Sequence, residues 1–244
     1  MNKTTCAIQY KIYIFTVCKD FRLVMQKFIL LIVMLFGAGM VTNGQSFLQI
    51  KYGASFPAGN FGENTNLDGS GHAQTGLGLQ AEYYNMFLNP VGIGLHYSFS
   101  FNSADFLKTG YRYAETYSNI VAGKYAMHDI TGIVVFKAFS SSFLTTSIRI
   151  SGGTSFISYP EVTKRFYENE QLSSEEVLFN KINAQKYLYG IGAALRYGVS
   201  DNTGISFTID YQNRFGGNQI PNERNYNIEQ VFVLLGIDFQ LGKK

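Results

Sequence analysis

The amino-acid sequence predicts an all-β protein: an eight-stranded antiparallel up-and-down transmembrane β-barrel preceded by a cleavable signal peptide. Three observations predict this fold class. Eight stretches alternate between apolar and other residues, several of them for ten residues or more. The connections between these stretches are alternately short and long. An uncharged apolar run, residues 28–41, precedes them all.

The apolar run at residues 28–41 is too short to cross a bilayer as a helix, which needs roughly 20 residues. Lys27 precedes it and small or polar residues follow it up to Gly44, which is the pattern of a secretory signal peptide. We expect cleavage after Gly44. The chain then has three segments: a misassigned extension over residues 1–24, a signal peptide over 25–44 and an outer-membrane β-barrel domain over 45–244.

Each predicted strand has one mainly apolar face, and the stretch from His128 to Phe139 is the least regular. From Val91 to Phe101, every odd-numbered residue is apolar, whereas the even-numbered residues are Gly, His or Ser. A period of two is the signature of a strand with different surroundings on its two faces. Lengths of ten residues or more suit tilted membrane strands of about 9–11 residues better than soluble strands of about 5–6. The predicted strands are Phe47–Phe56, Thr75–Phe87, Val91–Phe101, His128–Phe139, Phe143–Phe156, Lys186–Val199, Gly204–Phe215 and Ile228–Leu241.

The connections between these strands predict which end of the barrel faces which compartment. Three are short, at residues 89–90, 140–142 and 200–203. Four are long and polar, at residues 57–74, 102–127, 158–185 and 216–227. With an even number of strands, this layout places both termini on the periplasmic side and the long loops outside the cell. In the third long loop we expect a short helix over residues 172–183, because Ser173 or Ser174 can cap it.

The last predicted strand determines how the sheet ends. From Val231 to Leu241, every odd-numbered residue is apolar. A long apolar strand with a free edge promotes aggregation. We therefore expect this strand to pair with the first one, which closes the sheet into a barrel without edges.

The volumes of the two faces predict which of them points outward. An eight-stranded barrel has an interior just wide enough for side chains to fill it. The polar faces are rich in Gly, Ser, Ala and Thr and fit such a bore, whereas the Tyr, Phe, Leu and Ile of the apolar faces would overfill it. Aromatic residues also gather near both ends of the strands, as expected at two lipid–water boundaries. This favours a membrane barrel over a soluble barrel of the lipocalin kind, which hides its apolar face inside.

Two stretches carry a resemblance to a known family. Phe56–Gly62 (FPAGNFG) after the first strand and the closing Gly236–Leu241 (GIDFQL) resemble the small outer-membrane β-barrel ("porin family") proteins of Bacteroidota-type bacteria. These share their architecture with the OmpA transmembrane domain and OmpW. The resemblance covers roughly residues 46–244. It implies an outer-membrane location, with membrane lipid and the barrel-assembly machinery as partners.

The net charge excludes one class of partner. The formal charge of +3 includes the leader, and removing residues 1–44 takes away five of the 20 basic residues and one of the 17 acidic residues. The remaining 15 basic and 16 acidic residues give a net charge of −1, so a nucleic-acid partner is not expected. Cys6 and Cys18 also lie in the leader, so the mature chain has neither a disulfide framework nor a thiolate metal site.

The inward-facing charges form the candidate site. In a narrow lumen they must pair or reach water, because isolated burial is costly. We predict an ion-paired network that closes the lumen; the alternative is a narrow, weakly anion-preferring pore, since five positive charges face three negative ones. No catalytic residue, cofactor site or metal site is predicted. The predicted lumen polar network is Lys51, Glu82, His96, Lys137, Arg149, Arg196, Asp210, Arg214 and Asp238.

The favoured function is therefore a non-enzymatic, monomeric outer-membrane barrel with a structural or surface-binding role. Besides a small-solute channel, two further hypotheses stay open. A lipid-A-modifying barrel enzyme would need His96 and Ser98, which lie two apart on one strand face, but no obvious third group orients the His. A PorT-like component of a secretion system would need a partner that the sequence does not reveal. His72 and His128 have no companion at metal-ligand spacing.

Overall fold

The computed structural model of the protein describes residues 44–63, 70–105, 117–168, 171–217 and 226–241. The predicted extension and almost all of the predicted signal peptide lie outside the described residues. Residues 45–244 form one compact unit. Within the described ranges, no helix is both long and apolar enough to cross a membrane.

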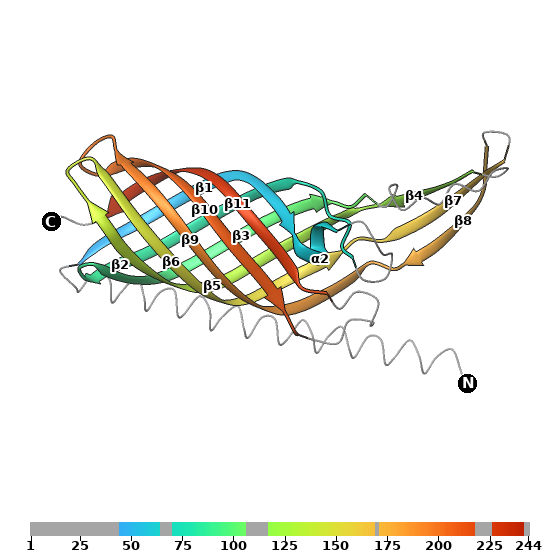
Figure 1. The fold of residues 1–244 in the computed structure, drawn as a ribbon, viewed down its shortest axis with the longest axis horizontal. Coiled ribbons are helices and arrows are strands. Elements are labelled where there is room, and N and C mark those ends of the chain that lie inside the picture. The colour runs from blue at the N-terminus through green and yellow to red at the C-terminus, as the bar shows by residue number, and fades with distance from the viewer. Residues whose placement is uncertain (1–43, 64–69, 106–116, 169–170, 218–225, 242–244) are drawn as a thin grey trace, which may run out of the picture. The chain divides into compact units, whose positions relative to one another are not determined.

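Eight strands form a closed antiparallel barrel, and all eight predicted strands are confirmed to within a few residues at their ends. Around the barrel, consecutive strands are neighbours, and β11 closes on β1 through pairs from Ser46–Leu241 to Ala58–Glu229 (Figure 1). The barrel strands are β1 (Gln45–Ala58), β2 (Gly76–Leu88), β3 (Val91–Ser103), β5 (Lys124–Ser140), β6 (Leu144–Tyr159), β9 (Ile182–Gly198), β10 (Thr203–Phe215) and β11 (Ile228–Leu241).

The strand register fixes the width of the bore. Following the paired residues from Lys51 through β2, β3, β5 and β6 leads to Lys186 on β9. Following them in the other direction, through β11 and β10, leads to Arg196 on the same strand. The difference between 196 and 186 is a shear of ten residues, which makes the strands tilt. An eight-stranded barrel of this kind has a bore that side chains can fill.

The two faces of each strand have opposite surroundings. On β11, Leu235 is 52% exposed on the outer wall, whereas its neighbour Leu234 is 0% exposed in the lumen. The same alternation runs through β10, where Ile205, Phe207 and Ile209 are exposed and the residues between them are buried. The apolar faces therefore point outward and the polar faces point inward.

A second, three-stranded sheet contains β4 (Tyr117–Ala122), β7 (Val162–Glu168) and β8 (Gln171–Phe179), with β7 in the middle. The predicted helix over residues 172–183 is wrong, because these residues form β8 and the start of β9. β7 supplies β8 with an antiparallel partner along its whole length, and Arg165 bonds Glu175 across the pair at 3.2 Å. These strand-to-strand contacts outweigh the local capping signal of Ser173 and Ser174, since helix propensity is a weak prior. Within the described ranges, a helix forms at α2 (Gly59–Gly62), a single turn after β1.

Candidate functional site

Four charged residues from four strands meet in the middle of the lumen, and we call them the central quartet: Lys51 (β1), Glu82 (β2), Arg149 (β6) and Asp210 (β10). Lys51 Nζ lies 2.7 Å from Glu82 Oε2. Arg149 bonds Glu82 through Nη1 and Asp210 through Nη2, the latter at 2.5 Å. All four side chains are buried, and two cations face two carboxylates. The quartet is therefore neutral and joins both sides of the barrel.

A glycine makes room for this quartet. A side chain at Gly192 would place its Cβ against the Asp210 carboxylate and 3.0 Å from the carbonyl oxygen of Ile209. Asp210 can therefore reach Arg149 only because β9 carries a hydrogen at this position. Gly192 is thus part of the site.

We expect Gly192→Ala to destabilise the barrel by about 1–3 kcal/mol, the usual cost of overpacking a well-packed interior. The new methyl group must displace Asp210 and weaken its bond to Arg149. Gly132→Ala is the matched control, because a Cβ there meets its nearest neighbour, the Gly152 carbonyl, at an ordinary 3.9 Å. Urea unfolding in phospholipid vesicles measures both. Equal losses of stability in the two variants would contradict the role of Gly192 in making room for Asp210.

A second ion pair lies nearer the long-loop end. Arg214 binds Asp129 with two bonds, Nε to Oδ1 at 3.0 Å and Nη2 to Oδ2 at 2.6 Å, and both side chains are fully buried. Ser98 Oγ donates to the same carboxylate at 2.6 Å. Asp129 was missing from the predicted network. Its odd number places it on the inward face with Thr131, so the alternation along β5 was enough to predict it.

Three more predicted residues lie towards the short turns. Arg196 Nε is 3.4 Å from Asp238 Oδ2, and Ser206 donates to Asp238 at 3.0 Å. Lys137 lies at the mouth of the lumen, where its Nζ is 5.7 Å from the centre of the Phe47 ring. The structure thus brings Arg196 together with Asp238, while Lys137 stands apart from the central quartet.

The structure adds Lys186 as well as Asp129 to the lumen. Lys186 Nζ donates to the Tyr226 carbonyl at 2.8 Å near the long-loop end. The lumen charges among the described residues are then six cations and four carboxylates, and each carboxylate lies within ion-pairing distance of a cation. The cations are Lys51, Lys137, Arg149, Lys186, Arg196 and Arg214, and the carboxylates are Glu82, Asp129, Asp210 and Asp238.

His96 and Ser98 form hydrogen bonds with other residues and not with each other. His96 Nδ1 lies 3.0 Å from the hydroxyl of Thr131, and its Nε2 lies 4.0 Å from Glu82. Ser98 is instead held by Asp129. The two residues therefore lack the nucleophile–base bond that covalent catalysis requires.

The remaining histidines lie apart. His72 is buried at the long-loop end, and His128 is exposed on the outer wall, where its Nδ1 is 2.8 Å from the Tyr97 hydroxyl. Among the described residues, no three His, Cys, Asp or Glu side chains are grouped so that they could hold a metal ion.

Apolar and aromatic side chains fill the lumen at the long-loop end. Tyr125 donates to the Gly71 carbonyl at 2.7 Å, and its hydroxyl lies 2.8 Å from that of Tyr226. Below this layer, Gln230 bonds Ser55 at 2.8 Å and Asn102 at 2.7 Å. We call the outer layer the aromatic cap: Phe61, Tyr125, Met127, Ile157, Tyr159, Tyr226 and Ile228.

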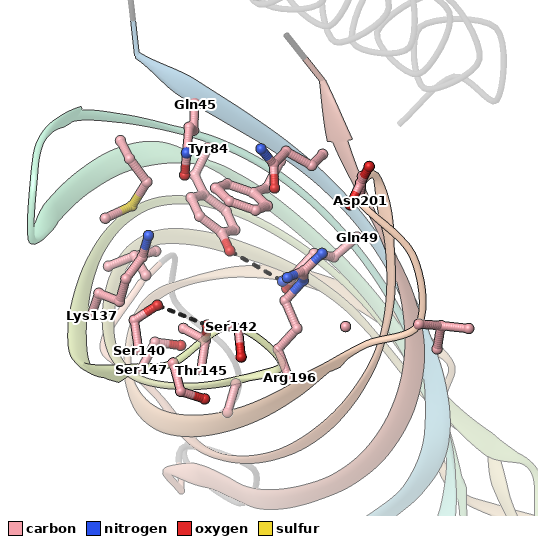
Figure 2. A pocket seen from close by; sticks show the side chains of 18 of the residues that line it. Gln45, Gln49, Tyr84, Lys137, Ser140, Ser142, Thr145, Ser147, Arg196 and Asp201 are labelled. Carbon is pink, nitrogen blue, oxygen red and sulfur yellow. Dashed lines mark hydrogen bonds between the residues drawn. The ribbon is translucent and has the colours of Figure 1, made fainter. Parts of the chain in front are cut away.

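The lumen holds a cavity at its short-turn end. It has a volume of about 320 Å³ and is lined by both strand and turn residues (Figure 2). Deeper in the bore, a void of about 10 Å³ beside Glu82, His96 and Arg149 is close to the least that one water molecule needs. Among the described residues, the ion pairs and the aromatic cap thus occupy the bore beyond this cavity.

Fold and lumen together define a closed, eight-stranded antiparallel β-barrel with an ion-paired interior. No protein-family model matches the sequence, and no curated protein matches it significantly. Similar solved structures include Neisserial surface protein A, with 10% identity, a TM-score of 0.47, and coverage of 82% of this chain and 98% of that one.

Two further solved structures are similar to this chain. One is a major outer membrane protein from Thermus thermophilus, with 13% identity, a TM-score of 0.46, and coverage of 80% of this chain and 99% of that one. The second is the outer membrane protein OprG from Pseudomonas aeruginosa, with 11% identity, a TM-score of 0.42, and coverage of 82% and 97%. At these identities and scores, the likenesses assign no function to this chain.

Proposed function

We propose that this protein is an integral outer-membrane β-barrel with a closed lumen and a non-enzymatic, structural or surface-binding role. Its termini face the periplasm and its long loops face outward. It is inserted as a monomer by the barrel-assembly machinery, and membrane lipid surrounds its outer wall. The observation that carries this proposal is the continuous apolar outer wall.

The outer wall is apolar on every barrel strand. Soluble monomers rarely expose a contiguous apolar patch larger than a few hundred Å². Here exposed Ile, Leu, Val, Tyr and Phe side chains encircle the whole barrel. Apart from tyrosines, the ionisable residues on the outward faces of the described barrel strands are Lys124, His128 and Glu229, all near the long-loop end. Contact of such a wall with hydrocarbon is favourable, whereas its exposure to water is unfavourable.

Exposed aromatic side chains support the same proposal at the two ends of the wall. Amphipathic aromatic rings are favoured where lipid meets water. Towards the long-loop end, exposed rings include those of Phe56, Tyr187, Tyr189 and Phe215. At the short-turn end they are those of Phe87, Phe139, Phe143, Tyr197 and Phe239.

Outer-membrane fractions test the proposal. Unboiled and boiled samples are compared by gel electrophoresis, since an intact small barrel migrates differently from its unfolded chain. The proposal expects the protein in this fraction, with a mobility that shifts on boiling. Recovery in the soluble periplasmic fraction would overturn it.

A narrow anion-selective channel is the second candidate, because six cations face four carboxylates in the lumen. We expect no discrete conductance steps from the purified protein in planar bilayers, because the central quartet and the aromatic cap fill the bore. The control is Tyr125→Ala together with Tyr226→Ala, which thins the cap and is expected to raise the frequency of openings. Regular unitary steps from the unmodified protein would favour the channel instead.

A further inference from the structure

Two basic side chains stand on the outer wall where β5 begins. Lys124 is the first residue of β5 and His128 follows four residues later, and both are exposed on the outward face of the strand. Within the described barrel strands, these are the outward-facing residues that can carry positive charge. Basic side chains are costly in hydrocarbon, so two of them at one place on an apolar wall point to a specific contact.

In the proposed membrane, the height of these residues corresponds to that of the lipid headgroups. From His128 to Phe139, whose exposed ring lies at the short-turn end of the wall, β5 advances by eleven residues. At about 3.3 Å per residue and a tilt of about 40°, this is roughly 28 Å of height, close to the ~25 Å apolar band of membrane barrels. His128 therefore lies at the opposite boundary of the band, and Lys124 lies further out.

Aromatic rings of β3 hold both basic side chains against the wall. Lys124 Nζ lies 5.6 Å from the centre of the Phe101 ring. The rings of His128 and Phe99 are 4.7 Å apart, and those of Phe99 and Phe101 are 6.1 Å apart. Because β3 and β5 are neighbours in the barrel, one row of rings joins the two basic groups (Figure 1). We call Lys124, His128, Tyr97, Phe99 and Phe101 the wall patch.

Within the described ranges, no carboxylate is paired with the basic groups of the wall patch. The Lys124 ammonium contacts the Phe101 ring, and a cation–π contact leaves its charge in place. Glu229, the acidic residue on the described outer wall, belongs to β11, which lies four strands from β5 in either direction around the barrel. Asp105, beyond the end of β3, accepts a bond from Gln74 Nε2 at 2.7 Å. A negatively charged ligand therefore complements the patch.

His128 adds a hydrogen-bond donor to this positive charge. Its Nδ1 lies 2.8 Å from the Tyr97 hydroxyl. When that hydroxyl donates to Nδ1, Nε2 carries the ring hydrogen and is the donor for a ligand. The exposure of the His128 ring leaves it accessible from the lipid side of the wall.

We propose that the wall patch binds an anionic phospholipid of the surrounding leaflet, with the phosphate oxygens of its headgroup between Lys124 and His128. Its acyl chains lie along the apolar wall beside the patch, where Leu77 and Leu79 are exposed on the neighbouring strand β2. The ligand is a lipid and not a free phosphate, because the donors stand on an otherwise apolar surface. This inference rests on the proposed function, since it needs a bilayer around the outer wall.

Native mass spectrometry of the full-length protein in detergent tests this proposal. Phosphatidic acid and phosphatidylcholine with identical acyl chains are added in equal amounts, and glycerol 3-phosphate serves as the free phosphate. We expect one molecule of phosphatidic acid to be retained at least fivefold more than phosphatidylcholine, and glycerol 3-phosphate not to displace it. Equal retention of the two lipids would overturn the proposal. Displacement by glycerol 3-phosphate would also overturn it, because the site would then take free anions.

Variants locate the binding. Lys124→Gln is expected to lower the retention of phosphatidic acid at least threefold, and the addition of His128→Gln is expected to lower it further. Lys124→Arg keeps the charge and is expected to change retention less than twofold. The matched control is Lys181→Gln, which removes an exposed lysine between β8 and β9 and is also expected to change retention less than twofold. Equal losses in Lys124→Gln and Lys181→Gln would show diffuse attraction and contradict the site.

The state of the barrel is measured separately for every variant. Each one is checked for recovery in the outer-membrane fraction and for a gel mobility that shifts on boiling. A protein that passes both checks and retains the two lipids equally contradicts the lipid site alone. A protein without these properties contradicts the proposed function instead.

Discussion

Glu82→Ala is expected to destabilise the barrel by about 3–5 kcal/mol, the cost of removing one partner from a buried ion pair. Glu82 forms ion pairs with both Lys51 and Arg149, which are 0% and 4% exposed. Removing the carboxylate leaves Lys51 buried without its counter-charge and Arg149 with Asp210 alone. Urea unfolding in phospholipid vesicles, followed by intrinsic tyrosine fluorescence and gel mobility, measures the loss.

Two comparisons separate this effect from simple truncation. Glu229→Ala is the matched control: Glu229 lies at the barrel edge, where the Tyr211 hydroxyl donates to it at 3.0 Å, and its loss is expected to cost about 1 kcal/mol. The double variant Lys51→Met with Glu82→Gln is expected to recover most of the stability, because it removes both charges and leaves Arg149 paired with Asp210. If Glu82→Ala cost no more than Glu229→Ala, the ion-paired lumen would not hold the barrel together.

Leu235→Arg is expected to cost about 2–4 kcal/mol, the penalty for arginine near the midplane of a bilayer. Leu235 lies in the middle of β11 on the outer wall and is 52% exposed. In water, an arginine at such an exposed position would change stability by only about 0.5 kcal/mol. The size of the effect therefore reports whether hydrocarbon surrounds the wall.

Leu241→Arg is the control for this prediction. Leu241 lies on the same face at the end of β11, where a membrane barrel meets water, and the cost there falls to about 0–1 kcal/mol. Unfolding of both variants in the same vesicles gives the difference. Equal and small costs at both positions would indicate a wall that faces water.

The barrel was predictable because each of its strands needs one face suited to the lumen and one suited to the outer wall, and this need determines the residue periodicity. Two different surroundings on the two faces of a strand produce alternation, and alternation could be read for all eight strands. The odd or even position of a residue along its strand also placed residues such as Lys51, Arg149 and Arg214 on inward faces. The alternation does not give the register between strands. The pair of Arg214 with Asp129, 85 residues apart, was therefore found only in the structure.

The errors have equally specific causes. Asp129 was overlooked although the predicted strand contains it, because it lay at the very start of that strand, whereas β5 begins four residues earlier, at Lys124. The helix predicted over residues 172–183 depended on local capping signals, and pairing of β8 with β7 overrode them. The cavity at the short-turn end could not be foreseen either, because it depends on where the two turns and the ring of Phe47 meet.

Folding with and without an amphiphile tests most directly whether hydrocarbon surrounds the outer wall. The urea-denatured protein is diluted into buffer that contains detergent micelles or none, and is followed by circular dichroism and sedimentation. We predict a monodisperse β-sheet protein with detergent and aggregation without it. A folded, monodisperse protein in plain buffer would contradict the account.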